Sequence, residues 1–327
     1  MFFFRVKKKQ GILYHPSMSL HGPILVTGGA GFIGSRLVRA LVGRGEDVCL
    51  LARKDASMPR IADLLPKLRF CEGDMCDADS IKRCLETVRP VGIFHLAASN
   101  IQSGVTAGKE DLVRTNIVGI STLLESARAM PYRFFVHTGS YLEYGPRSEP
   151  MRETDRCEPM ELYALTKLGA TLLGQAEARI HAKPVVTIRI FSPYGPGMQR
   201  GRLLEQMILK ALRGDELPMT RPDVARDFIY VDDIAELLLE AAEKATECTG
   251  GIFHAASGQS TTLQLLVDEV LRQTDSKSPV RWNAFPPVLY DTATCRADMG
   301  TTFARFAWRP AHDLASGLRE TIASYRT

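Results

Sequence analysis

Short runs of apolar residues alternate with amphipathic stretches along most of the chain. Six of these runs, rich in β-branched residues, predict strands at 24–28, 47–52, 68–74, 91–97, 133–139 and 184–190. Each run is apolar almost throughout, as expected of parallel strands that are covered on both faces. Between them, helix-like stretches lie near 33–44, 79–88, 109–130 and 160–181. This order predicts an α/β fold with a doubly wound parallel sheet.

The pattern changes at both ends of the chain. After Phe191 it loosens, which predicts a smaller C-terminal substrate-binding region made of 192–223 and 257–327. Within the stretch 224–256, "RDFIYVDDIA" and "GIFHAAS" are expected to return to the main sheet. In residues 1–21 an apolar "FFF" precedes the basic "RVKKK", the wrong order for a signal peptide, so we expect a flexible extension and consider Met18 an alternative start.

Composition excludes several classes of protein. The chain has 45% hydrophobic and 24% charged residues, as an ordinary water-soluble enzyme does, and no apolar run could span a bilayer. A net charge of +4 is too small to indicate nucleic-acid binding. The seven cysteines include no C-x-x-C pair, which indicates reduced thiols and a cytoplasmic location. The histidines form no metal-like cluster, so we predict no metal.

A glycine-rich turn follows the first predicted strand. "ILVTGGAGFIGSRLV" places Gly28, Gly31 and Gly34 between a strand and a helix start. Glycine allows the unusual dihedrals of this turn, and a Cβ would block the pyrophosphate of a dinucleotide that binds the helix N-terminus. We therefore predict a dinucleotide-binding Rossmann domain over 22–191, with Phe32 and Ile33 also at the cofactor.

The end of the second strand indicates which dinucleotide binds. NAD sites usually have an acidic residue there, whereas this chain has Ala52, then Arg53 and Lys54. A guanidinium pairs with a 2′-phosphate, so we predict NADP(H), with NAD(H) as the alternative; the other interpretation of Arg53 is a solvated basic turn. The remaining predicted cofactor contacts are Asp74, Met75, Leu96, Ala97, Ala98 and Phe191.

Tyr163 and Lys167, in "YALTK", are four residues apart and share one face of a predicted helix. In a chain of this composition, the number of Y-x-x-x-K matches expected by chance is roughly one third. The context is more specific, because the pair follows the fifth strand and lies downstream of the glycine turn.

The chain resembles the extended short-chain dehydrogenase/reductases, specifically the branch that modifies nucleotide sugars. The matching stretches span about 22–325 and are "TGGAGFIG", "EGDMCD", "HLAA", "TNIVGISTLLESAR", "YALTK", "RIFSPYGPG" and "RDFIYVDDIA". The resemblance implies that Tyr163 moves a proton to or from a sugar oxygen and that Lys167 stabilises the phenolate and binds the nicotinamide ribose. Ser140 would hold the same oxygen, and Arg226, otherwise a surface arginine, would bind the substrate diphosphate.

The segment "TGSYLEYG" bears on the reaction. Dehydratases and decarboxylases of this branch have a Glu, often after an Asp, two residues before the tyrosine of "YG"; here Leu142 follows Tyr141, and Glu143 stands one residue too late. The segment is similar to the G-S-x-x-E-Y-G of 4-keto-6-deoxy nucleotide-sugar reductases. We therefore expect an NADP(H)-dependent keto reductase. The alternatives are a 4-epimerase with tightly bound NAD and, less consistent with the intact tyrosine and lysine, a non-catalytic NADP sensor.

The resemblance implies further contacts. Tyr141 and Ser192 are expected at the substrate, although the branch usually has Asn at the second position. A second phosphate-binding arginine is common in the branch, and both Arg281 and Arg296 are candidates. Helices near 109–130 and 160–181 often mediate dimerisation in this family, so a homodimer is expected.

Overall fold

The structure is a computed structural model, and it describes residues 20–100, 108–286 and 295–326. Its main feature is a seven-stranded parallel sheet with the order β11-β6-β5-β4-β1-β2-β3. The strands are β1 (Pro23–Thr27), β2 (Asp47–Ala52), β3 (Arg69–Glu72), β4 (Gly92–His95), β5 (Phe134–Ser140), β6 (Val185–Ile190) and β11 (Ile252–Ala255). All six predicted strands are confirmed, as is the return of "GIFHAAS" to the sheet.

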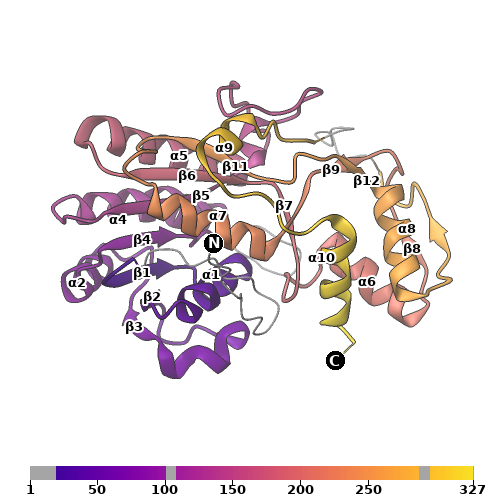
Figure 1. Cartoon of the computed structure of the whole chain (residues 1–327), viewed down its shortest axis with the longest axis horizontal. Coiled ribbons are helices and arrows are strands. Elements are labelled where there is room, and N and C mark those ends of the chain that lie inside the picture. The colour runs from indigo at the N-terminus through magenta and orange to yellow at the C-terminus, as the bar shows by residue number, and fades with distance from the viewer. Residues whose placement is uncertain (1–19, 101–107, 287–294, 327) are drawn as a thin grey trace, which may run out of the picture.

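Helices cover both faces of this sheet (Figure 1). In β1, Ile24 and Val26 pack on the face of α1 (Phe32–Gly43) and α7 (Val231–Glu243), whereas Leu25 packs toward the opposite face. That second face is covered by α2 (Ala78–Val88), α4 (Ile120–Ala127) and α5 (Leu162–His181). Because neighbouring residues enter two different cores, successive positions of such a strand are apolar instead of alternating with polar ones.

The predicted helix over 109–130 is interrupted. It consists of α3 (Lys109–Val113), a π-helical turn η2 (Arg114–Gly119) and then α4. A Cβ on Gly119 would lie 2.7 Å from the Met75 carbonyl oxygen, so the glycine allows the turn to approach the end of the β3 connection. A 3₁₀ segment, η1 (Pro59–Lys67), connects β2 with β3.

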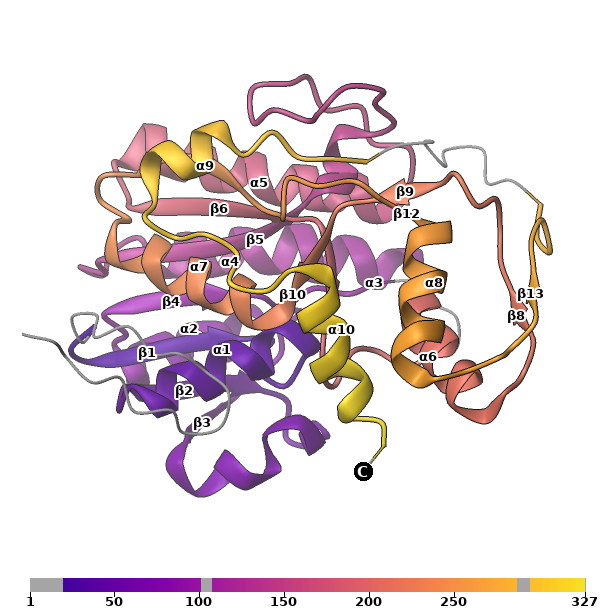
Figure 2. The same cartoon turned by 45° about the vertical axis from the view of Figure 1, so that its right-hand side comes forward.

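The C-terminal region forms a separate core beside the strand ends of the main sheet (Figure 2). Its helices are α6 (Leu203–Arg213), α8 (Leu263–Thr274) and α10 (Leu314–Ala323), and α9 (Gly300–Arg305) packs near β11. Three strand pairs join the region: β7 (Ser192–Tyr194) with β10 (Phe228–Tyr230), β9 (Ala225–Arg226) with β12 (Thr261–Thr262), and β8 (Leu217–Pro218) with β13 (Val280–Arg281).

Two sequence expectations need correction here. The strand of "RDFIYVDDIA", β10, pairs with β7 outside the main sheet, and only the following helix α7 returns to cover it. The predicted extension over 1–21 includes Leu20, which is buried and whose backbone N–H donates to Glu46 at 2.8 Å. Residues 1–19 lie outside the described residues.

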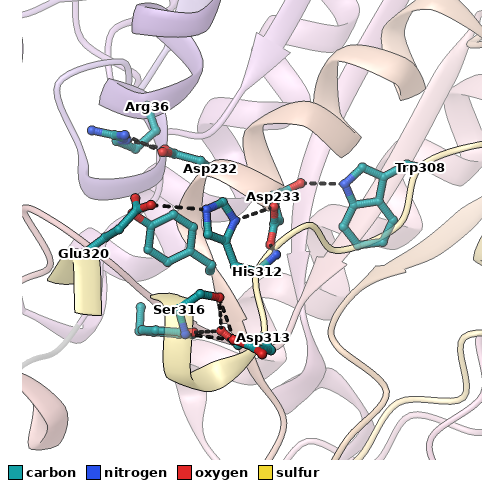
Figure 3. Close-up of polar contacts among 10 residues, drawn as sticks. Arg36, Asp232, Asp233, Trp308, His312, Asp313, Ser316 and Glu320 are labelled. Carbon is teal, nitrogen blue, oxygen red and sulfur yellow. Dashed lines mark hydrogen bonds and ion pairs between the residues drawn. The ribbon is translucent and has the colours of Figure 1, made fainter. Parts of the chain in front are cut away.

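Charged side chains connect the C-terminal helix to the main domain (Figure 3). Arg36 of α1 forms a two-bond ion pair with Asp232 at the start of α7. The neighbouring Asp233 accepts from His312 Nδ1 at 3.0 Å, and its backbone carbonyl accepts from Trp308 Nε1 at 2.8 Å. These contacts fix the segment before α10 against α7.

Candidate active site

The glycine turn lies directly against the end of β4. Gly28 has φ +73°, and a Cβ there would lie 2.5 Å from the backbone N of Ala97 and 2.6 Å from the carbonyl carbon of Leu96. A Cβ on Gly34 would lie 2.1 Å from the carbonyl oxygen of Gly28. Gly31 caps α1 without a side-chain hydrogen bond, so the first turn of the helix offers its N–H groups to a ligand. This cradle fits the pyrophosphate of a dinucleotide.

The residues predicted to contact the adenosine end follow the next two strands. Arg53 is exposed and comes directly after β2. Asp74 closes a tight turn after β3, since its Oδ1 accepts from the backbone N–H of Cys76 at 2.8 Å, and Met75 is buried. On the other side of the cradle, Leu96 and Ala97 are partly exposed and Ala98 is exposed.

Ser140 is the last residue of β5 and caps the 3₁₀ helix η3 (Tyr141–Tyr144). Its Oγ accepts from the backbone N–H of Leu142 at 3.2 Å, while its own backbone N–H donates to Glu143 Oε1 at 2.7 Å. This reciprocal arrangement is a capping box. The segment that follows β5 is therefore held in one conformation by hydrogen bonds at both Ser140 and Glu143.

Tyr163 and Lys167 lie one turn apart on α5. Lys167 is only 3% exposed, and its Nζ donates to the carbonyl oxygen of Thr138, two residues before Ser140. Burial lowers the pKa of Lys167 to about 8, against the opposing charge of Glu143. Burial raises the pKa of Tyr163 to about 12. Near pH 7 the phenol therefore carries its proton and the amine is an ammonium.

The predicted substrate residues converge beside this pair. The ring of Tyr141 stacks on Phe191, with centroids 5.3 Å apart and planes 21° apart. Burial raises the pKa of Tyr141 to about 12, whereas the charge of Arg226 and a hydrogen bond from Ser192 lower it. The structure thus brings residues from η3, β7 and β9 together.

Two further residues in this region were not predicted from the sequence. Arg202, which caps α6, is close enough for its charge to lower the pKa of both Tyr163 and Tyr141. Asp227 is fully buried, and its carboxylate accepts four hydrogen bonds from the segment after β11 and from the segment before α9. No local motif indicated either role.

The structure separates the two candidates for a second phosphate-binding arginine. Arg281 lies on β13 and forms a surface ion pair with Glu216 at 2.9 Å. Arg296 directly precedes Ala297, whose backbone N–H donates to Asp227 at 3.1 Å. Only Arg296 lies beside a residue that contacts the Arg226–Asp227 segment.

The described residues lack both a metal-binding cluster and a membrane-spanning helix. No cluster of histidine, cysteine or acidic side chains within 20–100, 108–286 and 295–326 could hold a metal ion. Over the same residues, no helix combines the length and the apolar character required to cross a bilayer.

Comparisons with known proteins agree with this geometry. Residues 24–256 match the model of the NAD dependent epimerase/dehydratase family. The dTDP-glucose 4,6-dehydratase of Neisseria meningitidis serogroup B is 30% identical, covering 92% of both chains. The UDP-glucose 4-epimerase of Thermotoga maritima, solved with UDP-glucose, has a TM-score of 0.85 and 26% identity, covering 93% of this chain and 98% of its own. MoeE5, solved with UDP-glucose and NAD, has a TM-score of 0.81 and 26% identity, covering 93% of this chain and 99% of its own.

Proposed function

This chain belongs to the NAD dependent epimerase/dehydratase family and is an enzyme that acts on nucleotide sugars, and from that premise we propose that it is an NADP(H)-dependent reductase of a keto nucleotide sugar. The favoured substrate is a nucleoside-diphospho-4-keto-6-deoxyhexose. One observation carries the choice of reaction: the positions at which elimination requires carboxylates hold Tyr141 and Leu142.

The third residue of this segment does not replace those carboxylates. Glu143 is fully buried, and both of its oxygens accept hydrogen bonds within the protein. Leu142 has no group that can take a proton from carbon. The raised pKa of Tyr141 keeps its phenol protonated near pH 7, so it cannot serve as the base either. The segment therefore supports hydride transfer better than loss of water.

The chain's own residues account for the proton that a reduction needs. A bound nicotinamide would supply the hydride to the keto carbon. Tyr163 would donate its phenolic proton to the keto oxygen, Ser140 would hold that oxygen, and the Lys167 ammonium would stabilise the phenolate that remains. Hydride and proton together convert the ketone into an alcohol, and solvent returns the proton to Tyr163.

We extend the proposal to cofactor choice and assembly. Exposed Arg53, directly after β2, supports NADP(H) because it can pair with a 2′-phosphate. Leu165 and Leu172, seven residues apart on α5, are 54% and 50% exposed, and Val118 of η2, which packs against α5, is 51% exposed. A second copy that covered these side chains would give the homodimer expected for this family. All seven cysteines are free thiols, which fits a reducing compartment such as the cytoplasm.

The second candidate is a 4-epimerase, favoured by the similarity to the UDP-glucose 4-epimerase of Thermotoga maritima. The same Tyr163 and Lys167 would then serve an oxidation followed by a reduction at C4. The sensor hypothesis predicts no role for the Tyr163 proton.

A panel assay separates these functions. The purified protein is incubated with UDP-glucose, UDP-glucuronate, dTDP-glucose and a set of 4-keto nucleotide sugars, each with NADPH and with NADH. The reductase proposal predicts stoichiometric NADPH consumption with a 4-keto substrate, and Tyr163→Phe should lose about 10²- to 10⁴-fold in turnover. Co-purified NAD⁺ that does not exchange, together with epimer formation and no net NADPH use, would show the epimerase. Formation of a 4-keto product from dTDP-glucose would refute the argument from Leu142.

A further inference from the structure

A fully buried carboxylate lies directly beneath Ser140. Both Glu143 oxygens are occupied: Oε1 accepts from the Ser140 backbone N–H at 2.7 Å, and Oε2 accepts from Thr171 Oγ1 at 3.0 Å and from Arg189 Nε at 2.8 Å. Glu143 is 0% exposed and Arg189 is 2% exposed. Taking two charges out of water is costly, and an ion pair of this kind adds little net stability compared with apolar packing. The pair therefore requires an explanation other than stability.

The backbone before Ser140 accommodates this carboxylate. A Cβ on Gly139 would lie 2.7 Å from Glu143 Oε1 and 3.0 Å from Cγ of Arg189. Any larger residue at this position would push the carboxylate away from the Ser140 amide. The glycine and the glutamate of "GSYLE" are thus one structural unit.

The same carboxylate acts on the acid–base pair of α5. Its charge raises the pKa of Lys167 against the larger, lowering effect of burial, and it also raises the pKa of Tyr163. The other ionisable groups that sense Lys167 are His95 of β4 and His137 of β5, whose pKa values are lowered chiefly by burial, so both rings are neutral. Among the described residues, Glu143 is the carboxylate whose negative charge acts on the Lys167 ammonium.

The counter-ion of this carboxylate is Arg189 of β6. The Arg189 guanidinium lies over the Tyr144 ring at 4.3 Å and also donates to Cys157 Sγ at 3.2 Å. Arg189 and Thr171 both donate to Glu143 Oε2, so the carboxylate joins β6 to α5.

Within the function proposed above, we propose that Glu143 is a positioning residue: its carboxylate fixes Ser140 in place and, held by Thr171 one helical turn beyond Lys167 on α5, places a negative charge near the Lys167 ammonium. Glu143 touches neither substrate nor cofactor and acts only through these two residues. The carboxylate does not need to be exposed for this role. Because it is buried, water and salt screen its charge on Lys167 less than they would at the surface.

The test measures the titration of Lys167 directly and needs no substrate. Lysine labelled with ¹³C at Cε is incorporated into the full-length protein, and the Lys167 signal is assigned from its loss in Lys167→Arg. Glu143→Gln should move the titration midpoint to lower pH by about one unit, a tenfold change in the protonation constant. Thr171→Val is the matched control: it removes a hydrogen bond to the same carboxylate but no charge, and its midpoint should stay near that of the wild type.

A second variant keeps the test decisive if Glu143→Gln does not fold. Glu143→Asp withdraws the same charge by one methylene, and its Lys167 midpoint should fall below that of the wild type. A midpoint in E143Q that coincides with T171V, or one in E143D that equals the wild type, would overturn the proposal. Because no turnover is involved, this result is independent of the panel assay. Where that assay finds a reaction, the basic limb of its pH profile should move with the NMR midpoint.

Discussion

Replacing Asp227 by asparagine should detach the C-terminal segments from the main sheet. The carboxylate is fully buried at the end of β9, and each oxygen accepts two hydrogen bonds. Oδ1 accepts from the backbone N–H and the Oγ of Ser257, at 2.8 and 2.7 Å, and Oδ2 accepts from the backbone N–H groups of Gly258 and Ala297, at 3.0 and 3.1 Å. Burial raises the pKa of Asp227 to about 6, so the group is ionised at pH 7.5 and all four donors are satisfied.

The cost follows from this geometry. An asparagine has only one acceptor oxygen, so its NH₂ group must face one of the two pairs of donors. Facing Gly258 and Ala297, it would leave two backbone N–H groups unpaired; facing Ser257, it would leave only the backbone N–H, because the hydroxyl can turn and accept. Each buried donor left without a partner costs about 1–3 kcal/mol, so the better orientation still costs roughly 1–3 kcal/mol. This is a substantial part of the roughly 5–15 kcal/mol by which a domain is typically stable, so Asp227→Asn should be destabilising.

Urea unfolding at pH 7.5 checks this expectation. Both tryptophans, Trp282 and Trp308, lie in the C-terminal part of the chain, so their fluorescence reports on the affected region. The control is Asp223→Asn, which removes a carboxylate from an exposed ion pair with Arg221 and should cost less than about 1 kcal/mol. If the free energies of unfolding of the two variants agree within about 0.5 kcal/mol, which is the usual effect of a surface substitution, then Asp227 does not hold the segments together.

Three further outcomes are expected. Arg53→Ala should weaken NADPH binding about 10- to 100-fold and leave NADH binding nearly unchanged, because one charge-assisted contact is lost; titration of both cofactors checks this, and an unchanged ratio would contradict the NADP(H) proposal. The proposed homodimer should dissociate in Leu172→Glu, because the substitution places a charge on the exposed α5 surface; light scattering checks this, and a mass equal to that of the wild type would contradict an interface at Leu172. Burial lowers the pKa of His312, but the carboxylates of Asp233 and Glu320 outweigh burial, so the net pKa is raised. The stability gained from the charged imidazole is therefore complete below about pH 6.5 and is lost as the pH rises through the folded-state pKa. His312→Gln should therefore lose more stability at pH 5.5 than at pH 8.5, and a loss independent of pH would show that the charge does not contribute.

The strands of the main sheet could be predicted from sequence because each local pattern has one structural reason. In the run 24–28, Ile24, Leu25 and Val26 are all apolar since the two faces of the strand enter different cores. The three-residue strands β7 and β10 carry no such signal, and their pairing depends on where the C-terminal region packs. The π-helical turn η2 was also not predicted: its last residue, Gly119, lies against Met75, which is distant in the chain, and no pattern within 109–130 marks that contact.

The site divides in the same way. Motifs with a local physical reason, such as the glycine turn or the spacing of Tyr163 and Lys167, could be recognised before the structure. Interactions such as Glu143–Arg189 join residues 46 positions apart, and no pattern along the chain encodes them. The sequence did contain one neglected signal: Ser140 and Glu143 have the S-x-x-E spacing of a capping box.

That signal changes the meaning of the departure from the dehydratase pattern. Taken alone, Leu142 shows only that this position lacks the carboxylate that elimination needs. Together with Gly139, Ser140 and Glu143 it belongs to a segment whose carboxylate stands one residue later than in the dehydratase pattern and is fully buried against the Ser140 backbone. Since a 3₁₀ helix turns by about 120° per residue, a shift of one position changes the face on which the side chain lies. The same segment can therefore support an acid–base tyrosine through a buried charge, or provide a carboxylate to the substrate, and the position of one glutamate distinguishes the two.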